Sequence, residues 1–189
     1  MIPSRTWALE LIASGNMPAH ILRHSETVRL VALLVARLLI EAGIEIDLKL
    51  VDRAALLHDI CKAESILGGG DHALMGRKLM EQHGFHRVGE VIGQHVRLES
   101  LEINEAMVVN YSDKRVMHEK VVSLQKRFVD LMDRYGTDEQ RMRRIMAHYA
   151  QAREVEGILV SRSGMDPALV EALNLIAQDH ALYGRDGLL

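Results

Sequence analysis

The sequence has little of what several common protein classes require. Only one cysteine, Cys61, occurs among 189 residues, so no disulfide can form within the chain. The three prolines, at positions 3, 18 and 167, stand where helices are expected to begin, and proline is tolerated there. No Asn-Gly or Asp-Gly pair joins two alternating runs, so the usual signal of a β-hairpin is missing. These absences exclude a disulfide-stapled scaffold and favour an all-α protein.

The charge balance and the apolar runs exclude two further classes. The formal net charge of -3 at pH 7 argues against a protein that coats nucleic acid, because such proteins are usually basic. The longest apolar stretch, residues 30–40, contains Arg37 and is too short to cross a bilayer. The first residues lack a basic segment followed by an apolar run, so no signal peptide is expected. We therefore expect a cytoplasmic protein without membrane contact, whereas a small anionic ligand is compatible with this charge.

Helical periodicity runs through most of the chain. Positions 28, 31, 35, 38 and 39, for example, are all valine or leucine and share one face of a helix. Caps and breaks divide the pattern, with Asp47, Asp71 and Thr137 as expected N-caps. The expected helices run from about 4 to 14, 19 to 43, 48 to 57, 72 to 83, 87 to 96, 103 to 135, 138 to 160 and 167 to 180. No repeat or long linker divides the chain, so we expect a single domain over residues 1–189.

The most informative pattern is a series of imidazole and carboxylate side chains. In chain order it comprises His24, His58, Asp59, His72, His95 and Asp113. The adjacent pair His58 and Asp59 follows an apolar run, residues 54–57, where a buried helix should end. Imidazole and carboxylate together suit Fe, Mn, Zn or Co, whereas carboxylate and water alone favour Mg. Four histidines and two aspartates can hold two ions if one carboxylate bridges them, and the central Asp59 is the natural bridge.

Short motifs around these residues resemble the HD-domain metal-dependent phosphohydrolases, whose pattern is H…HD…D. The motifs are Arg23-His24-Ser25, Leu57-His58-Asp59-Ile60-Cys61-Lys62, Asp71-His72, Gln94-His95 and Tyr111-Ser112-Asp113-Lys114. The extra His72 and His95 resemble the two-metal branches, which include the bacterial di-iron diadenosine tetraphosphate hydrolases. The resemblance covers about residues 18–120. It implies an all-α HD-domain helical bundle with this core and with additional C-terminal helices over about 121–182.

The resemblance also implies the role of each ligand. By analogy, a first ion would be bound by His24, His58, Asp59 and Asp113, and a second by Asp59, His72 and His95. The cofactors would be two divalent metal ions, Fe or Mn first, with Zn, Co, Ni or Mg as alternatives, and a hydroxide between them would attack phosphorus. The substrate would be a small phosphorylated metabolite, in particular a nucleotide. After position 112 the chain reads Asp-Lys-Arg-Val-Met, whereas diadenosine tetraphosphate hydrolases have Asp-Tyr-Ile-Glu-Pro there.

Several cations are candidates for contact with a substrate phosphate. Lys62 follows His58 by four residues, so we expect it beside the catalytic Asp59 as a catalytic and substrate-binding group. The other candidates, chosen by their nearness in sequence to the ligands, are Arg23, Arg97, Lys114 and Arg115. The glycines at 68–70 lack the Gly-Lys-Ser/Thr ending of a P-loop, and their expected role is to turn the chain so that His72 faces the metal.

Each feature also has an alternative interpretation. His58 and Asp59 could be a hydrogen-bonded pair at a helix end, and Asp113 an exposed carboxylate. If His72 and His95 only lie at helix ends and do not bind metal, the site holds one metal. A non-catalytic module that binds a nucleotide or a partner protein is a second interpretation of the function, and a diiron oxygenase on the same scaffold is a third. The sequence leaves the oligomeric state open, including a homodimer.

Overall fold

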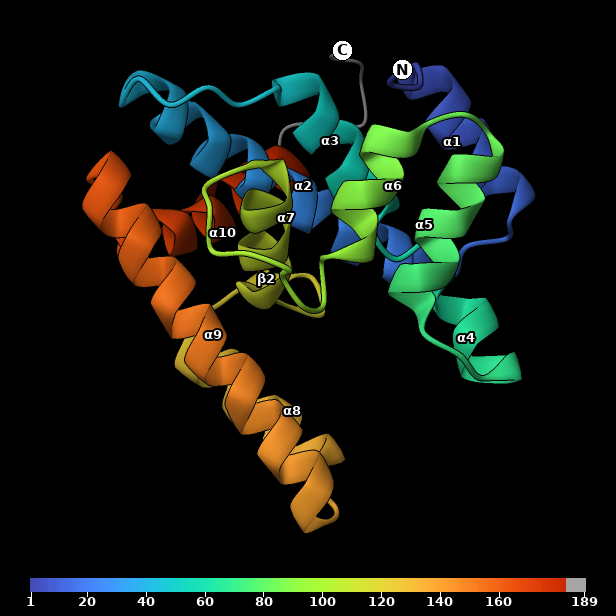
Figure 1. Cartoon of the computed structure of the whole chain (residues 1–189). Helices are drawn as coiled ribbons and strands as arrows, with labels where there is room; N and C mark the ends of the chain where they lie inside the picture. The colour runs from blue at the N-terminus through green and yellow to red at the C-terminus, as the bar shows by residue number, and fades with distance from the viewer. Residues whose placement is uncertain (183–189) are drawn as a thin grey trace.

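The computed structural model describes residues 1–182 and is built almost entirely of helices (Figure 1). In chain order the elements are α1 (Arg5–Ser14), α2 (Ala19–Glu41), α3 (Leu48–Leu57), α4 (Lys62–Gly68), α5 (His72–Gln82), α6 (His86–Gly93), α7 (Glu105–Lys114), β1 (Val116–Met117), β2 (Lys120–Val121), α8 (Leu124–Tyr135), α9 (Glu139–Ser163) and α10 (Pro167–Leu182). This arrangement confirms the all-α fold class. Within the described residues, no helix combines the length and the apolar character needed to pass through a membrane.

Capping side chains explain where several helices begin. The carboxylates of Asp47 and Asp71 accept backbone hydrogen bonds in the first turns of α3 and α5, as the sequence predicts. At α9 the cap is Asp138 rather than the expected Thr137, because Asp138 has the extended backbone of an N-cap and accepts from the amide of Arg141. The caps of α3 and α5 matter most, since these helices position metal-ligand candidates.

The core lies around α2. Its buried face carries Val28, Val31, Val35 and Leu39, and Leu38 is partly buried, so the predicted apolar face is confirmed. Helix α2 packs against both α3 and α7, whereas α5 and α6 pack against each other beside α3. Each fully buried aliphatic side chain contributes about 1.5–3 kcal/mol to this packing. The core therefore holds α2, α3 and α7 in a defined relation, and each of them carries or precedes part of the ligand series.

The expected continuous helix over residues 103–135 is wrong in its middle. Helix α7 ends at Lys114, an antiparallel hairpin pairs Val116 with Val121, and α8 begins only at Leu124. The turn of the hairpin places His118 at φ 57°, a left-handed conformation that an α-helix cannot contain. The β-branched valines favour a strand here, and no Asn-Gly pair marks the turn. The interruption lets α8 leave the direction of α7.

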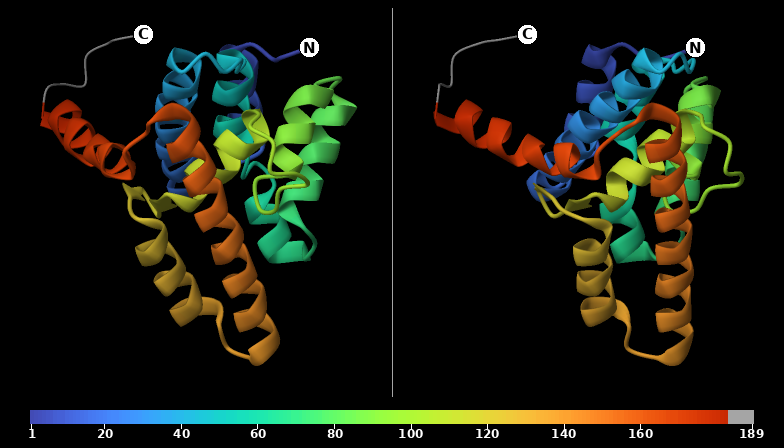
Figure 2. Two further views of the ribbon diagram at one scale, coloured as in Figure 1. Left: turned by 60° about the vertical axis from the view of Figure 1, so that its left-hand side comes forward. Right: turned by 90° about the vertical axis from the view of Figure 1, so that its left-hand side faces the viewer.

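Helices α8 and α9 form an arm that extends from the rest of the molecule (Figure 2). The two helices lie side by side and run in opposite directions. Helix α9 also packs against α2 and α7, and its buried residues are Ala152, Val155 and Leu159. Helix α10 contacts α2 and β2, on the side opposite to α5 and α6 (Figure 2). The arm is therefore joined to α7, the helix that carries Asp113.

Candidate metal centre

The six expected metal ligands come from five segments that are distant in sequence, and they meet in one place. Their positions are His24 in α2, His58 and Asp59 directly after α3, His72 at the start of α5, His95 two residues beyond α6, and Asp113 in the last turn of α7. The helix before His95 ends at Gly93 instead of residue 96. It ends there because the backbone amide and the ring of His95 both bond to the carbonyl of Ile92, which closes a turn.

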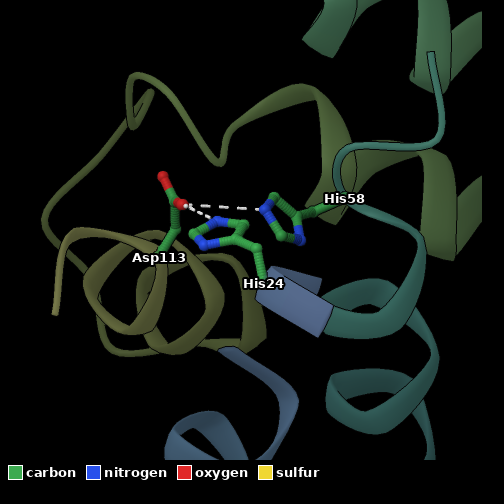
Figure 3. A group of neighbouring side chains, drawn as sticks. All are labelled: His24, His58 and Asp113. Atoms are coloured by element: carbon green, nitrogen blue, oxygen red, sulfur yellow. Dashed lines mark hydrogen bonds and ion pairs between the residues drawn. The ribbon is translucent and has the colours of Figure 1, made fainter. Parts of the chain in front are cut away.

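His24, His58 and Asp113 form a first group of neighbouring ligand atoms (Figure 3). One carboxylate oxygen of Asp113, Oδ1, lies 3.0 Å from His24 Nε2 and 3.6 Å from His58 Nε2. Ligand atoms that share one ion through bonds of about 2.1 Å are separated by about 3 to 4 Å. The spacing of this group therefore suits a single metal ion.

His58, Asp59 and His95 form a second group, which shares His58 with the first. Asp59 Oδ2 lies 3.6 Å from His58 Nε2, whereas Asp59 Oδ1 lies 3.5 Å from His95 Nε2 and 3.2 Å from His72 Nε2. The Nε2 atoms of His72 and His95 are 3.0 Å apart. The two oxygens of Asp59 thus face different imidazoles, which is the arrangement that a carboxylate between two ions needs.

Backbone carbonyls orient three of the imidazole rings. The Nδ1 atoms of His24, His58 and His95 lie 2.8 Å from the carbonyl oxygens of residues 118, 55 and 92. These contacts assign the proton to Nδ1, which donates, and leave a lone pair on each Nε2. Nε2 of His58 is buried and finds no hydrogen-bond partner among the described residues. A buried polar atom without a partner is costly, and a divalent cation is the partner that this set of imidazoles and carboxylates fits.

Burial and mutual contacts shift the pKa values in this cluster. Burial raises the pKa of the Asp59 and Asp113 carboxyls, but the surrounding imidazoles outweigh it and hold both pKa values well below their usual range. Burial lowers the pKa of His95. Burial also opposes protonation of His58, yet the neighbouring carboxylates raise its pKa. Both carboxylates are therefore ionised at neutral pH, which is the form that binds metal.

A pocket of about 720 Å³ opens beside these ligands, and both His24 and Asp59 line it. Its walls come from the start of α2, from α4, from the β1–β2 turn and from α8. Lys62, at the start of α4, places Nζ 3.3 Å from both oxygens of Asp59 and 3.4 Å from His72 Nε2. About 38% of the Lys62 side chain is exposed, so this cation can contact both the ligands and a molecule in the pocket.

The other four residues that the sequence suggests as substrate contacts are placed less well for binding a substrate than Lys62 is. Lys114 is buried, and its ammonium donates to the carbonyls of residues 95, 96 and 110. Arg115 is also buried, and protein groups of α9 and α10 and the carbonyl of residue 122 surround its guanidinium. We therefore leave Lys114 and Arg115 out of the proposed substrate contacts. Arg23 is exposed and pairs with Glu119 at 2.7 Å, Arg97 is exposed in the loop after α6, and both stay predictions.

Two parts of the site have no clear signal in the sequence. The carbonyl of His118 orients the His24 ring only because the unexpected hairpin carries it there. Arg127, Arg134 and Tyr135 of α8 line the pocket, although they lie beyond the ligand series. Their spacing of seven and eight residues would have placed them on one helical face, but it does not indicate what that face contacts.

Comparisons with known proteins relate the chain to one family. The family model of the HD domain matches residues 21–138, a span that contains the whole ligand series. Among solved structures, the crystal structure of a predicted HD superfamily hydrolase from an uncultured Thermotogales bacterium is similar. It has 20% sequence identity and a TM-score of 0.48, over 85% of this chain and 93% of that chain. Among curated proteins, none matches this chain.

Proposed function

Because the chain belongs to the HD domain family, whose members bind divalent metals, we propose that it is a metal-dependent hydrolase of a phosphoester or phosphoanhydride bond. One observation carries this proposal. Imidazoles and carboxylates from separate elements meet beside a pocket, and within the part of the chain that the structure describes the buried Nε2 of His58 has no hydrogen-bond partner. A hydrogen-bonded pair at one helix end would not need ligand atoms from so many elements.

The ligands divide naturally between two ions. We propose that His24, His58 and Asp113 hold one ion, that His72 and His95 hold the other, and that Asp59 contacts both. The mixed imidazole and carboxylate set favours Fe or Mn, is compatible with Zn, Co and Ni, and is less suited to Mg. The resemblance to two-metal HD-domain branches rests on the same residues.

The chain's own side chains supply binding and positioning. Divalent ions, when bound, supply Lewis acidity that lowers the pKa of water and neutralises phosphoryl oxygens. Lys62, 3.3 Å from Asp59, puts a positive charge where phosphoryl oxygens would lie and stabilises negative charge that develops there. The backbone contacts of His24, His58 and His95 keep the ligand rings in place before a substrate arrives.

The pocket supports a small phosphorylated metabolite as the substrate, in particular a nucleotide. Its volume of about 720 Å³ lies in the range of small-molecule sites. Ile21, Ile66 and Leu131 provide apolar surface, and the ring of Tyr135 can stack on a flat organic group. A phosphate end would lie at Lys62, and the organic part would lie against this apolar wall.

Metal analysis and a phosphoester assay test the proposal together. Protein purified anaerobically without a metal-binding tag should contain about two equivalents of Fe or Mn and should hydrolyse a phosphoester with that metal. Asp59→Ala should lose both metal retention and turnover, because the carboxylate between the two sets of imidazoles is removed. The matched control is Asp133→Ala, which removes an exposed carboxylate of α8 and should change neither property.

The other outcomes separate the alternative functions. About one equivalent of metal would remove His72 and His95 from the ligand set. Metal binding without hydrolysis of any phosphoester would favour a binding module. Oxygen consumption with a mixed-valent iron pair would favour an oxygenase, whereas Mn-supported turnover without oxygen would exclude one. Full turnover by Asp59→Ala would overturn the proposed mechanism.

A further inference from the structure

The wall that α8 contributes to the pocket is rich in arginine. Residues 127, 131, 134 and 135 line the pocket, and their spacing places them on one face of the helix. Two of the four are Arg127 and Arg134. Because α8 belongs to the extended arm (Figure 2), this cationic wall comes from a different part of the fold than Lys62 of α4.

Arg127 lies between two cavities of the site. It lines the pocket that contains His24 and Asp59, and it also lines a cavity of about 100 Å³ that contains Asp113 and Lys114. Only 16% of its side chain is exposed, and its buried Nε has no hydrogen-bond partner in the described part of the chain. A guanidinium pairs with phosphate oxygens through two parallel hydrogen bonds, and Arg127 lines the pocket in which a phosphoryl group would lie.

The wall carries more positive charge than nearby carboxylates neutralise. Asp130 is shared, since its Oδ2 lies 3.6 Å from Arg127 Nη1 and also pairs with Arg134. Glu119, another acid that lines the pocket, pairs with Arg23 at 2.7 Å. One carboxylate between two guanidinium groups leaves an excess of positive charge, which attracts an anion.

We propose that Arg127 binds a second phosphoryl group of the substrate, adjoining the one held beside Asp59 and Lys62. This inference rests on the proposed function and deepens it, because it names the substrate class as compounds with two adjoining phosphoryl groups. Lys62 and Arg127 stand on different walls of one pocket. A single phosphate would lie against only one of these two cations, whereas two adjoining phosphoryl groups can engage both.

Binding of two inorganic probes to the full chain loaded with Mn²⁺ tests the inference. Orthophosphate has one phosphoryl group, and imidodiphosphate has two and resists hydrolysis. By isothermal titration calorimetry, wild type should bind imidodiphosphate more tightly than orthophosphate. Arg127→Gln should weaken imidodiphosphate binding by about 10- to 100-fold and orthophosphate binding by less than about 2-fold. Arg127→Lys should recover part of the loss, because it restores the charge but not the planar fork.

The matched control is Arg143→Gln, an exposed arginine of α9 that pairs with Glu139 and should change neither affinity. Chelation of free Mn²⁺ by imidodiphosphate is the same for every variant, so it cancels in the comparison. Equal losses for both probes in Arg127→Gln would indicate a structural role and overturn the inference. No loss for either probe would overturn it as well.

The proposed function is tested separately, by turnover of a phosphomonoester. If wild type hydrolyses the ester but shows no preference for imidodiphosphate, this inference fails and the proposed function stands. If the preference depends on Arg127 but no ester or anhydride is hydrolysed, the proposed function fails and the anion site stands.

Discussion

At the scale of single residues, Lys114 has a different role from the substrate contact that the sequence suggests. Its ammonium is buried and lies 3.0, 3.2 and 3.3 Å from the backbone carbonyls of residues 95, 96 and 110. Burial lowers the pKa of Lys114 to about 8, although the neighbouring carboxylate of Asp113 opposes this shift. The amine therefore stays mostly charged at neutral pH and holds the loop that carries His95.

We expect this buried lysine to make stability depend on pH between about 8 and 10. In the unfolded chain the pKa of lysine is about 10.4, so over this range the unfolded state binds a proton that the folded state has lost. The contribution of Lys114 to the free energy of unfolding therefore rises with pH. Urea unfolding should show wild type gaining about 2 kcal/mol relative to Lys114→Met between these pH values.

The control for this measurement is Lys126→Met, which changes an exposed lysine of α8 and should follow wild type at every pH. A constant difference in stability between wild type and Lys114→Met across the range would contradict the prediction. That result would mean that Lys114 has an ordinary lysine pKa in the folded protein.

At the scale of elements, the close packing of α5 against α6 (Figure 1) controls one half of the candidate centre. A Cβ atom at Gly89 of α6 would lie 2.9 Å from the backbone oxygen of Arg77 in α5, so only glycine fits there without movement. Helix α5 begins with His72, and α6 leads to His95. The separation of these helices therefore sets the 3.0 Å distance between the two Nε2 atoms.

Gly89→Ala should therefore weaken the half of the centre that contains His72 and His95. Because a backbone oxygen cannot move aside as a flexible side chain can, we expect the helices to separate at a cost of about 1–3 kcal/mol in stability. Metal content should fall from about two equivalents toward about one, measured by elemental analysis. The control is Gly157→Ala on α9, where the added Cβ has no described atom within 4 Å. This variant should leave the metal content unchanged. Unchanged metal content and stability in Gly89→Ala would refute this account.

Local sequence determines much at this scale. The apolar face of α2 and the caps Asp47 and Asp71 are predicted correctly, because they act within one or two turns of the chain. The hairpin over 116–121 is not predicted, because its left-handed residue is His118 rather than glycine or asparagine. Because the sequences before and after the hairpin both have helical periodicity, they predict one continuous helix.

At the scale of the whole molecule, Arg115 joins the C-terminal helices to α7. Its Nε donates to the carbonyl of Val122 at 2.8 Å, and its Nη1 lies 3.1 Å from Glu156 of α9. Its Nη2 donates to the carbonyl of Pro167 at 2.9 Å and lies 3.4 Å from Glu171 of α10. One buried guanidinium thus connects three helices, while the single-domain organisation over 1–189 stays a prediction.

Arg115→Met should destabilise the protein by about 1–3 kcal/mol, because it removes the buried guanidinium that bonds to the carbonyls of residues 122 and 167 and pairs with the partly exposed carboxylates of Glu156 and Glu171. Urea unfolding measures this loss, and hydrogen exchange should show the amides of α10 losing protection before those of α2. Arg153→Met, which changes an exposed arginine of α9, should have little effect. If Arg115 were a substrate contact instead, the variant would keep its stability and lose only substrate affinity.

The sequence by itself determined which side chains can bind metal and the order in which they occur, because imidazole and carboxylate chemistry belongs to each residue alone. It also determined the helical class, since periodicity and caps are local. Only the tertiary structure decided that His58 belongs to both ligand groups, that Lys114 and Arg115 support the backbone, and that α8 brings Arg127 to the pocket. These features depend on contacts between residues far apart in sequence, which no local pattern encodes.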